Sequence, residues 1–283
     1  MTYTLDPAAG FSKSRIYDNR QKIAYENTRA ELTALGQPGL AKRTLHLQFT
    51  ALDKTVVYCY IRKNACSAFK KMLCDSSEFR QHRLALQTDL KFLLQYHSVS
   101  ARGDISNVDH RIFVYRDPIT RIVALFINKF IVRSSNSDIF LNYKSVMKKD
   151  PGEVTFRDFV YHYLGQTQTI LDPHCLSQCR HLWPVFYTEA IPIERLYFET
   201  ALLFGHEFAN KHFKLKVNST IGNEFTEPAW NVPSVDLHHR YRRIGEIPSA
   251  ASLVSDPIRQ RLREIYADDF MMIAGLVGGG AGQ

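Results

Sequence analysis

The chain has 283 residues, of which 45% are hydrophobic and 23% charged, and its formal net charge at pH 7 is +8. This length and composition are typical of a globular protein with a sizeable core, in one large α/β domain or two small ones. No apolar run approaches the roughly 18 residues of a membrane span, and the first residues lack the apolar segment of a signal peptide. We therefore expect a soluble, cytoplasmic protein without a membrane span.

The positive charge favours an anionic partner, which includes a nucleotide, a sulfated or acidic glycan, nucleic acid and a membrane surface. Charge alone does not choose among them. The cysteines are odd in number and do not form the two close pairs of a four-ligand zinc site, which suits a reducing compartment. They are Cys59, Cys66, Cys74, Cys175 and Cys179.

The first predicted elements form a strand, crossover and strand unit. Helix-forming residues that end at "GQPG" predict an N-terminal helical arm over residues 1–40. The segment "TVVYCYI" (55–61) is β-branched and aromatic without polar alternation, which is typical of a strand buried on both faces of a parallel sheet. A second such strand is "RIFVYR" (111–116), and residues 67–96 between them predict one or two helices.

The second strand is followed at once by a buried helix. Asp117 can cap that helix and Pro118 fits its first turn, while "ITRIVALFINKF" (119–130) is apolar on nearly every side. Further on, residues 154–164 predict a helix and "RLYFET" (195–200) predicts a third strand.

The last third of the chain is more polar. Residues 217–256 are rich in Asn, Pro, Ser and charge, so we expect a long surface loop or lid there. Ile258, Leu262 and Ile265 mark one face of a C-terminal helix. We expect one main domain over 41–276 and a disordered tail over 277–283.

Both predicted strands end in basic residues. Lys63 and the small-residue turn Asn64-Ala65-Cys66-Ser67 follow the first strand, whereas Arg116 ends the second and Arg121 lies one turn into the next helix. In open α/β sheets, anions bind beyond the carboxyl ends of strands, where helix N-termini carry positive partial charge. The first turn resembles a phosphate-binding loop without the GxxxxGK[ST] spacing of an ATPase. Two cationic strand ends predict a ligand with two separated anionic groups.

These two segments resemble the motifs of a known family, the family 2 carbohydrate sulfotransferases. "IRKNACSAFKKML" resembles the family's 5′-phosphosulfate loop, a strand followed by PK-x-(A/G)-C-(S/T)-x-W-K, and "VYRDPITRIVALFINKF" is similar to its 3′-phosphate motif. Weaker similarities follow in the family's order, so the resemblance runs discontinuously from about residue 55 to 276. They are "FRDFVYHYL", "DPHCLSQCRHL", "IPIERLYFET" and "LREIYADDFMMIAGL".

The resemblance implies a P-loop-like, three-layer α/β fold with a central, mainly parallel sheet flanked by helices. It implies transfer of a sulfuryl group from 3′-phosphoadenosine-5′-phosphosulfate to a hydroxyl of a carbohydrate or similar acceptor, with no metal and no nucleic-acid partner. Lys63 would neutralise the leaving phosphate, and Arg116 would bind the 3′-phosphate. The donor-binding positions that match the motifs are Arg62, Lys63, Asn64, Ala65, Cys66, Ser67, Arg116, Arg121 and Ala124.

The chain departs from the family pattern at three positions: Arg62 replaces a proline, Phe69 a tryptophan and Ala124 a serine. Loss of the serine hydroxyl removes one hydrogen bond to the 3′-phosphate, worth about 1.5 to 3 kcal/mol. The groups that can compensate are left open; they are Lys129, Arg133 and the "HHRYRR" cluster at 238–243.

Some features of the function stay open at this point. His97 is the first candidate for the general base that deprotonates the acceptor hydroxyl, with His110 and His174 as alternatives. Acceptor specificity is expected in loops such as 132–152 and 217–256. One rival is a nucleotide-dependent phosphotransferase, which would need a carboxylate-held Mg²⁺ and a Walker A lysine-serine pair. Another is a non-catalytic, degenerate basic module that binds nucleic acid or acidic glycan.

Overall fold

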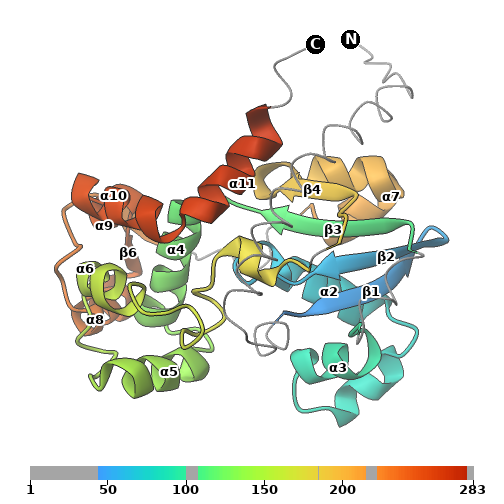
Figure 1. The fold of residues 1–283 in the computed structure, drawn as a ribbon. Coiled ribbons are helices and arrows are strands. Elements are labelled where there is room, and N and C mark those ends of the chain that lie inside the picture. The colour runs from blue at the N-terminus through green and yellow to red at the C-terminus, as the bar shows by residue number, and fades with distance from the viewer. Residues whose placement is uncertain (1–43, 100–107, 184, 215–221, 279–283) are drawn as a thin grey trace. The chain divides into compact units, whose positions relative to one another are not determined.

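The computed structural model describes residues 44–99, 108–183, 185–214 and 222–278 (Figure 1). The chain groups into two compact units. Unit 1 comprises Met1–Tyr115, Gln178–Leu215 and Met271–Gln283, and unit 2 comprises Arg116–Ser177 and Lys216–Phe270. The expected helical arm over residues 1–40 lies outside the described residues, and the limits of the expected single domain stay a prediction.

Unit 1 is built on a four-stranded sheet with the order β1-β2-β3-β4. β1 pairs antiparallel with β2, whereas β2, β3 and β4 are parallel, so the predicted mainly parallel sheet is confirmed. The two predicted strands correspond to β2 and β3, and β1 was not predicted. The bounds are His46–Ala51 for β1, Lys54–Cys59 for β2, His110–Tyr115 for β3 and Glu189–Pro192 for β4.

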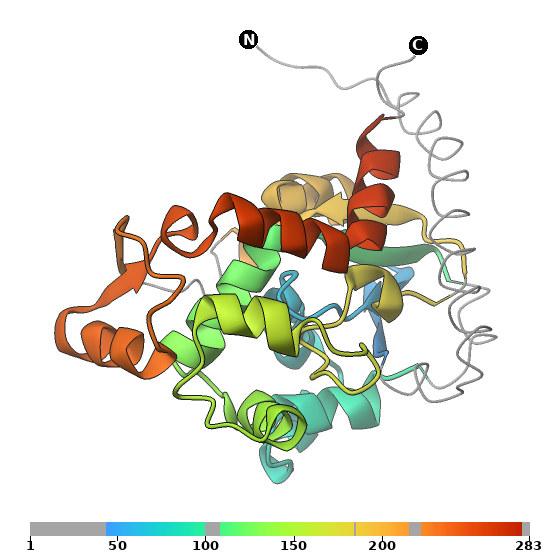
Figure 2. The same cartoon turned by 60° about the vertical axis from the view of Figure 1, so that its left-hand side comes forward.

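Helices α2 (Cys66–Ser76) and α7 (Leu196–His212) cover one face of this sheet. The Tyr58 ring of β2 stacks on Phe69 of α2 with a centroid separation of 3.8 Å, and Phe49 of β1 meets Phe204 of α7 at 6.2 Å. α7 lies along β4 in both views (Figures 1 and 2). Both aromatic pairs are buried, which explains why β2 is apolar on this side.

The opposite face is covered by the short helix η6 (Gln178–His181), the segment after it, and α11 (Ala267–Gly278). Val57 packs against Trp183, and Phe113 lies 5.2 Å from Tyr187 between ring centroids. Because adjacent residues of a strand point to opposite faces, Val57 and Tyr58 bury their side chains in different layers. Unit 1 therefore has the expected three layers, with the sheet in the middle.

The crossover from β2 to β3 is helical, as predicted. It contains α2, the 3-10 helix η2 (Arg80–Ala85) and α3 (Asp89–Tyr96), which Thr88 caps by accepting from the Lys91 N–H. The parallel pairing of β2 with β3 places the carboxyl ends of both strands at the same edge of the sheet.

The third strand predicted at 195–200 is wrong, because this segment begins α7. Leu196, Thr200 and Phe204 are buried at intervals of four residues, which is the spacing of one helix face rather than of a strand. Arg195 and Glu199 also form an i,i+4 ion pair at 2.9 Å. The strand is the preceding "EAIP", which is too short to give a clear alternation in the sequence.

Unit 2 is mainly helical, with a two-stranded parallel sheet of β5 and β6. The predicted helix after Asp117 is α4, continued by the π-helix η4, and its burial is confirmed. The predicted helix at 154–164 is also confirmed. The elements are α4 (Pro118–Phe126), η4 (Ile127–Ile131), α5 (Ser137–Met147), α6 (Phe156–Asp158), η5 (Phe159–Tyr163), β5 (Asn223–Phe225), α8 (Ser234–Ile244), β6 (Glu246–Pro248), α9 (Ala250–Leu253) and α10 (Asp256–Ile265).

The long loop expected at 217–256 is wrong for residues 222–256, which contain β5, α8, β6 and α9. α8 buries only Ser234 and Leu237, so its other positions are free to be polar, and the helix has the composition of a loop. The expected loop at 132–152 likewise contains α5.

The last described helix, α11, extends to Gly278, so the boundary expected at residue 276 falls inside a helix. Among the residues that the structure describes, no helix is long and apolar enough to cross a membrane.

Replacing Phe69 with alanine should destabilise unit 1, because the ring is fully buried between Tyr58 and Phe213. We expect a loss of about 3 to 5 kcal/mol in the free energy of unfolding, measured by urea denaturation. The matched control is Phe198→Ala, which removes a ring that is 43% exposed and should cost about 0.5 kcal/mol or less. Equal losses for the two variants would mean that Phe69 does not anchor α2 to the sheet.

Candidate functional site

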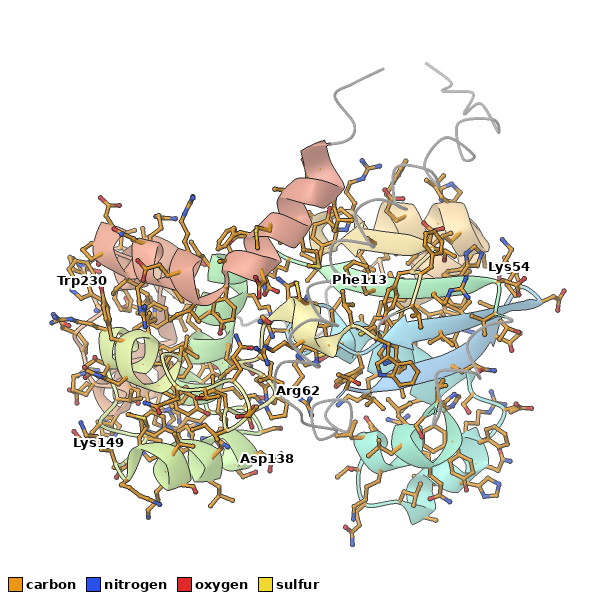
Figure 3. The ribbon with its side chains drawn as sticks, viewed as in Figure 1. Lys54, Arg62, Phe113, Asp138, Lys149 and Trp230 are labelled. Carbon is orange, nitrogen blue, oxygen red and sulfur yellow. The ribbon has the colours of Figure 1, made fainter. Side chains whose placement is uncertain are left out.

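The β2–α2 loop, residues 60–65, leaves the carboxyl end of β2 in a strained conformation. Strand β2 begins at Lys54, and Arg62 lies in the loop beyond its other end (Figure 3). Lys63 has φ 69° and Ala65 has φ 56°, in the left-handed region that residues with a Cβ seldom adopt. Strain of this kind costs of order 1 to 3 kcal/mol per residue and concentrates at functional sites. The loop therefore has the character of a binding site rather than of a simple connection.

Asn64, between the two strained residues, anchors this loop inside unit 1. Its side chain is fully buried, and Nδ2 donates to the Val114 carbonyl at 2.9 Å and to Gln178 Oε1 at 2.5 Å. Tyr58 Oη donates to the Asn64 carbonyl at 3.3 Å. The loop is thus tied to β3 and to η6 by side-chain hydrogen bonds, which explains how the strain at Lys63 and Ala65 is maintained.

The loop ends in an open helix N-terminus. Ala65 is the N-cap of α2, and within the described residues no side chain caps this helix. The first N–H groups of a helix have no partner in the helix itself and carry partial positive charge. Lys63, Cys66 and Ser67 are half-buried at this end. A half-buried lysine, strained backbone and an uncapped eleven-residue helix together suit a phosphate or sulfate group.

The second basic strand end has an ordered arginine. Arg116 is the first residue of unit 2, and its Nε donates to Thr120 Oγ1 at 3.2 Å. Asp117 caps α4 by accepting from the Thr120 N–H at 2.8 Å, as predicted. The cap fixes Thr120, and Thr120 in turn orients Arg116 beside a helix N-terminus. The same local chemistry again suits an anion.

α4 has two different faces. Arg121 is fully buried, and its Nη2 donates to the His174 carbonyl at 3.1 Å. Thr120, Ala124 and Asn128 are instead only half-buried and follow each other at intervals of four residues, on one face of the helix. Ala124 therefore lies outside the core of unit 2, on the same face as Thr120, whereas the position of Arg121 favours an internal role.

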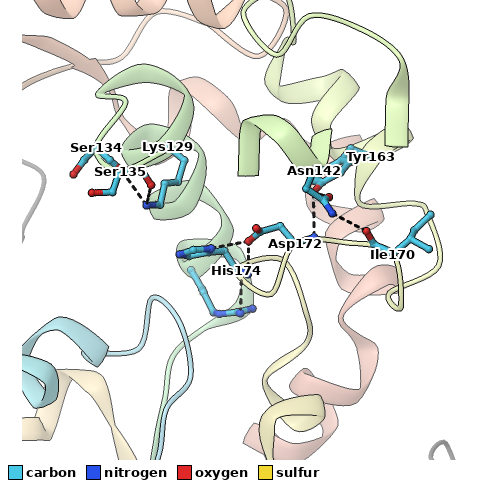
Figure 4. Close-up of polar contacts among 9 residues, drawn as sticks. Lys129, Ser134, Ser135, Asn142, Tyr163, Ile170, Asp172 and His174 are labelled. Atoms are coloured by element: carbon cyan, nitrogen blue, oxygen red, sulfur yellow. Dashed lines mark hydrogen bonds and ion pairs between the residues drawn. The ribbon is translucent and has the colours of Figure 1, made fainter. Parts of the chain in front are cut away.

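Two of the groups that were expected to compensate for Ala124 have internal partners. Lys129 Nζ donates to the carbonyls of Ser134 at 2.9 Å and Ser135 at 2.6 Å (Figure 4). Arg133 Nε donates to the Phe130 carbonyl at 3.5 Å.

The basic cluster at 238–243 lies on α8 and is only partly engaged. Arg240 pairs with Glu246 at 2.6 Å and lies 3.6 Å from the centre of the Phe225 ring. His239, Arg242 and Arg243 are exposed at the surface of unit 2. Of the three candidates in the described structure, this cluster has exposed basic side chains, whereas Lys129 is buried and Arg133 is half-buried.

The three candidate histidines differ sharply in their surroundings. His97 has Nδ1 2.9 Å from the Gln48 carbonyl and Nε2 2.9 Å from Ser77 Oγ, so both ring nitrogens are engaged inside unit 1. His110 begins β3, at the strand end opposite to Tyr115, and burial lowers the pKa of its imidazole. His174 has Nδ1 2.6 Å from Asp172 Oδ1 (Figure 4).

The family is decided by comparison with known sequences. The sulfotransferase family matches residues 48–272, from β1 to α11. The chain belongs to this family. Human carbohydrate sulfotransferase 14 is 25% identical to it over 192 residues, which cover 59% of this chain and 48% of the human protein. This sulfotransferase-family chain thus spans about half the length of that relative. No solved structure matches the chain significantly.

Two residues near the site were not found from the sequence. Asp172 pairs with His174, and Gln178 accepts from Asn64 of the β2–α2 loop. The signal was present in the weak similarity "DPHCLSQC", which contains all three of Asp172, His174 and Gln178. The partner of Gln178 is far away in the chain, whereas Asp172 and His174 are two residues apart, a spacing that does not by itself show a contact.

Replacing Asn64 with aspartate should weaken unit 1 strongly. A carboxylate cannot donate to the Val114 carbonyl or to Gln178 Oε1, and its charge would be fully buried. We expect a loss of about 3 kcal/mol or more in the free energy of unfolding and faster hydrogen exchange in the β2–α2 loop. Asn231→Asp, at an exposed position, is the control and should change little. A stable Asn64→Asp protein with unchanged exchange would show that these two bonds do not hold the loop.

Proposed function

We propose that this chain transfers a sulfuryl group from 3′-phosphoadenosine-5′-phosphosulfate to a hydroxyl group of a carbohydrate. The observation that carries the proposal is the β2–α2 loop, where Lys63 and an open helix N-terminus follow a buried parallel strand. Membership of the sulfotransferase family supports the reaction, and the name of the human relative supports a carbohydrate acceptor.

In this proposal the β2–α2 loop and the start of α2 bind the 5′-phosphosulfate. The N–H groups of the first turn of α2 and the Ser67 hydroxyl donate to its oxygens, and Lys63 neutralises the charge that develops on the leaving phosphate. That charge is greatest in the transition state, so Lys63 acts mainly on turnover. Arg62 lies 6.0 Å from the centre of the Tyr60 ring and adds positive charge beside the loop.

Arg116 is proposed to bind the 3′-phosphate. Its planar guanidinium suits bidentate contact with phosphate oxygens, and its bond to Thr120 reduces the freedom that it loses on binding. The N-terminus of α4 supplies further positive partial charge. Arg121, which is buried against the His174 carbonyl, is proposed to position this region rather than to touch the donor.

Sulfuryl transfer, like phosphoryl transfer, passes through a loose in-line transition state, so positioning and charge stabilisation supply most of the catalysis. The residues named above supply both without a metal ion. The expected absence of a nucleic-acid partner and the cytoplasmic location stay predictions.

Binding of 3′,5′-adenosine bisphosphate is the first test. We expect it to raise the thermal unfolding temperature clearly more than AMP or ATP at equal concentration, because a ligand that binds only the folded protein stabilises it by mass action. Arg116→Ala should weaken the bisphosphate about tenfold or more while affecting adenosine 5′-phosphosulfate much less, since only the bisphosphate carries the 3′-phosphate. The exposed Arg157→Ala serves as the control. Stabilisation by ATP alone would instead support a phosphotransferase.

Lys63 offers a test that separates charge from backbone strain. Lys63→Ala keeps a Cβ at φ 69°, whereas Lys63→Gly removes it and should stabilise the fold by about 1 kcal/mol. Both variants should lose sulfuryl transfer by about 100-fold or more, because both remove the cation. Activity is measured as transfer from labelled donor, with exposed Lys91→Ala as the control. Nearly full turnover in either variant would remove Lys63 from the mechanism.

A further inference from the structure

We propose that His174, oriented by Asp172, is the general base that takes the proton from the acceptor hydroxyl. The inference rests on the proposed sulfotransferase function and adds to it the residue that handles the proton. His174 and Asp172 lie in unit 2, in the segment between η5 and η6.

The geometry of the pair is that of an oriented imidazole. Asp172 Oδ1 lies 2.6 Å from His174 Nδ1 and also accepts from the His174 backbone N–H at 2.8 Å. The Asp172 side chain is 6% exposed and that of His174 is 20% exposed. A buried carboxylate that accepts from Nδ1–H leaves the lone pair on Nε2, so the neutral ring is in the tautomer that a base requires.

The segment that carries the pair is held in place from two helices. The Asp172 N–H donates to Tyr163 Oη at 3.2 Å, and Tyr163 Oη donates to Asn142 Oδ1 at 2.5 Å. Asn142 Nδ2 in turn donates to the Ile170 carbonyl at 3.0 Å (Figure 4). The carboxylate therefore does not need to reorganise when the imidazole becomes charged.

One hydrogen bond inside unit 2 connects His174 to a segment that is proposed to bind the donor. Arg121 of α4 donates to the His174 carbonyl, and α4 is the helix that begins just after Arg116. The backbone at His174 is therefore held against the helix that follows the proposed 3′-phosphate contact.

The other two candidates are less suitable for a base. If His97 Nδ1 donates to the Gln48 carbonyl, the Nε2 lone pair that a base would use already accepts a buried hydrogen bond from the Ser77 hydroxyl. His110 lies at the amino end of β3, and a strand of six residues places it about 17 Å from the carboxyl end. Lys63 and Arg116 both follow carboxyl ends.

The proposed step balances in atoms and charge. The acceptor oxygen forms a bond to sulfur while the bond from sulfur to the bridging oxygen of the 5′-phosphate breaks. The electron pair of that bond leaves on the phosphate of 3′,5′-adenosine bisphosphate. The hydroxyl proton passes to His174 Nε2, and the imidazolium that forms is paired with Asp172.

Three charged groups of unit 2, from three elements, lie near the pair. Asp172 belongs to the same segment, and Arg121 reaches it from α4. Burial raises the pKa of the Tyr266 phenol, and the nearby Asp269 of α11 adds to the rise. This phenol donates to the Cys175 carbonyl at 2.7 Å. The charges of these three groups influence the pH at which His174 gains a proton, and therefore the pH at which kcat falls on the acid side.

The test compares His174→Asn with wild type. Asparagine keeps an amide donor near the position of Nδ1, so the bond to Asp172 can persist while the base is lost. We expect kcat for release of 3′,5′-adenosine bisphosphate from the donor, in the presence of carbohydrate acceptors, to fall by about 100-fold or more. Thermal stabilisation by added bisphosphate should be unchanged, and the fall in kcat at low pH should disappear. The matched control is His162→Asn, which removes an exposed histidine 3.6 Å from Asp158 and should change nothing.

Asp172→Asn tests the positioning role separately. It should lower kcat by about tenfold or more with little change in KM for the donor, because an amide donor facing Nδ1 stabilises the wrong tautomer. A His174→Asn enzyme that keeps wild-type kcat and its pH dependence would overturn the base assignment while leaving the proposed function intact. A wild-type protein that binds the bisphosphate but releases none from the donor, with any carbohydrate tested, would overturn the proposed function and this inference with it.

Discussion

The hydrogen bonds of the Asn64 side chain are the constraint on which the proposed donor site depends. They connect the β2–α2 loop to the Val114 carbonyl of β3 and to Gln178 of η6, all inside unit 1. Together with the bond from Tyr58 to the Asn64 carbonyl, they offset the cost of left-handed backbone at Lys63 and Ala65. Buried polar bonds thus hold a strained loop that carries Lys63 and ends at the N-terminus of α2, which no side chain caps among the described residues.

In unit 2, helix α4 holds two of the proposed functional residues in position. Its buried face carries Arg121, which holds the His174 carbonyl, and its half-buried face carries Thr120, which orients Arg116. One helix therefore connects the proposed 3′-phosphate contact to the proposed base. The bond from Nη2 to the His174 carbonyl offsets part of the cost of burying the Arg121 charge, since a buried charge is costly unless it is hydrogen-bonded.

The sequence predicted the features that depend on local pattern. The buried strands β2 and β3, the cap at Asp117 and the buried α4 all follow from periodicity and helix-start chemistry. The strand predicted at 195–200 was wrong, and so was the predicted loop over residues 222–256, because a short strand and a polar amphipathic helix carry weak periodic signals. The site residues were found by resemblance, but His97 is engaged by Gln48 and Ser77, whose distance along the chain hides them from local pattern. Asp172 and His174 are only two residues apart, and that spacing alone does not show that their side chains meet.

The most direct test of the account is to follow the sulfuryl group itself. Protein, 3′-phosphoadenosine-5′-phosphosulfate and a set of desulfated glycosaminoglycans and simple glycosides are incubated without added metal, and the products are identified by mass spectrometry. We predict a sulfated carbohydrate and an equal amount of 3′,5′-adenosine bisphosphate, both dependent on the acceptor and both lost with Lys63→Ala. Tight binding of the bisphosphate with no sulfated product, or transfer of phosphate from ATP to the same acceptors, would contradict it.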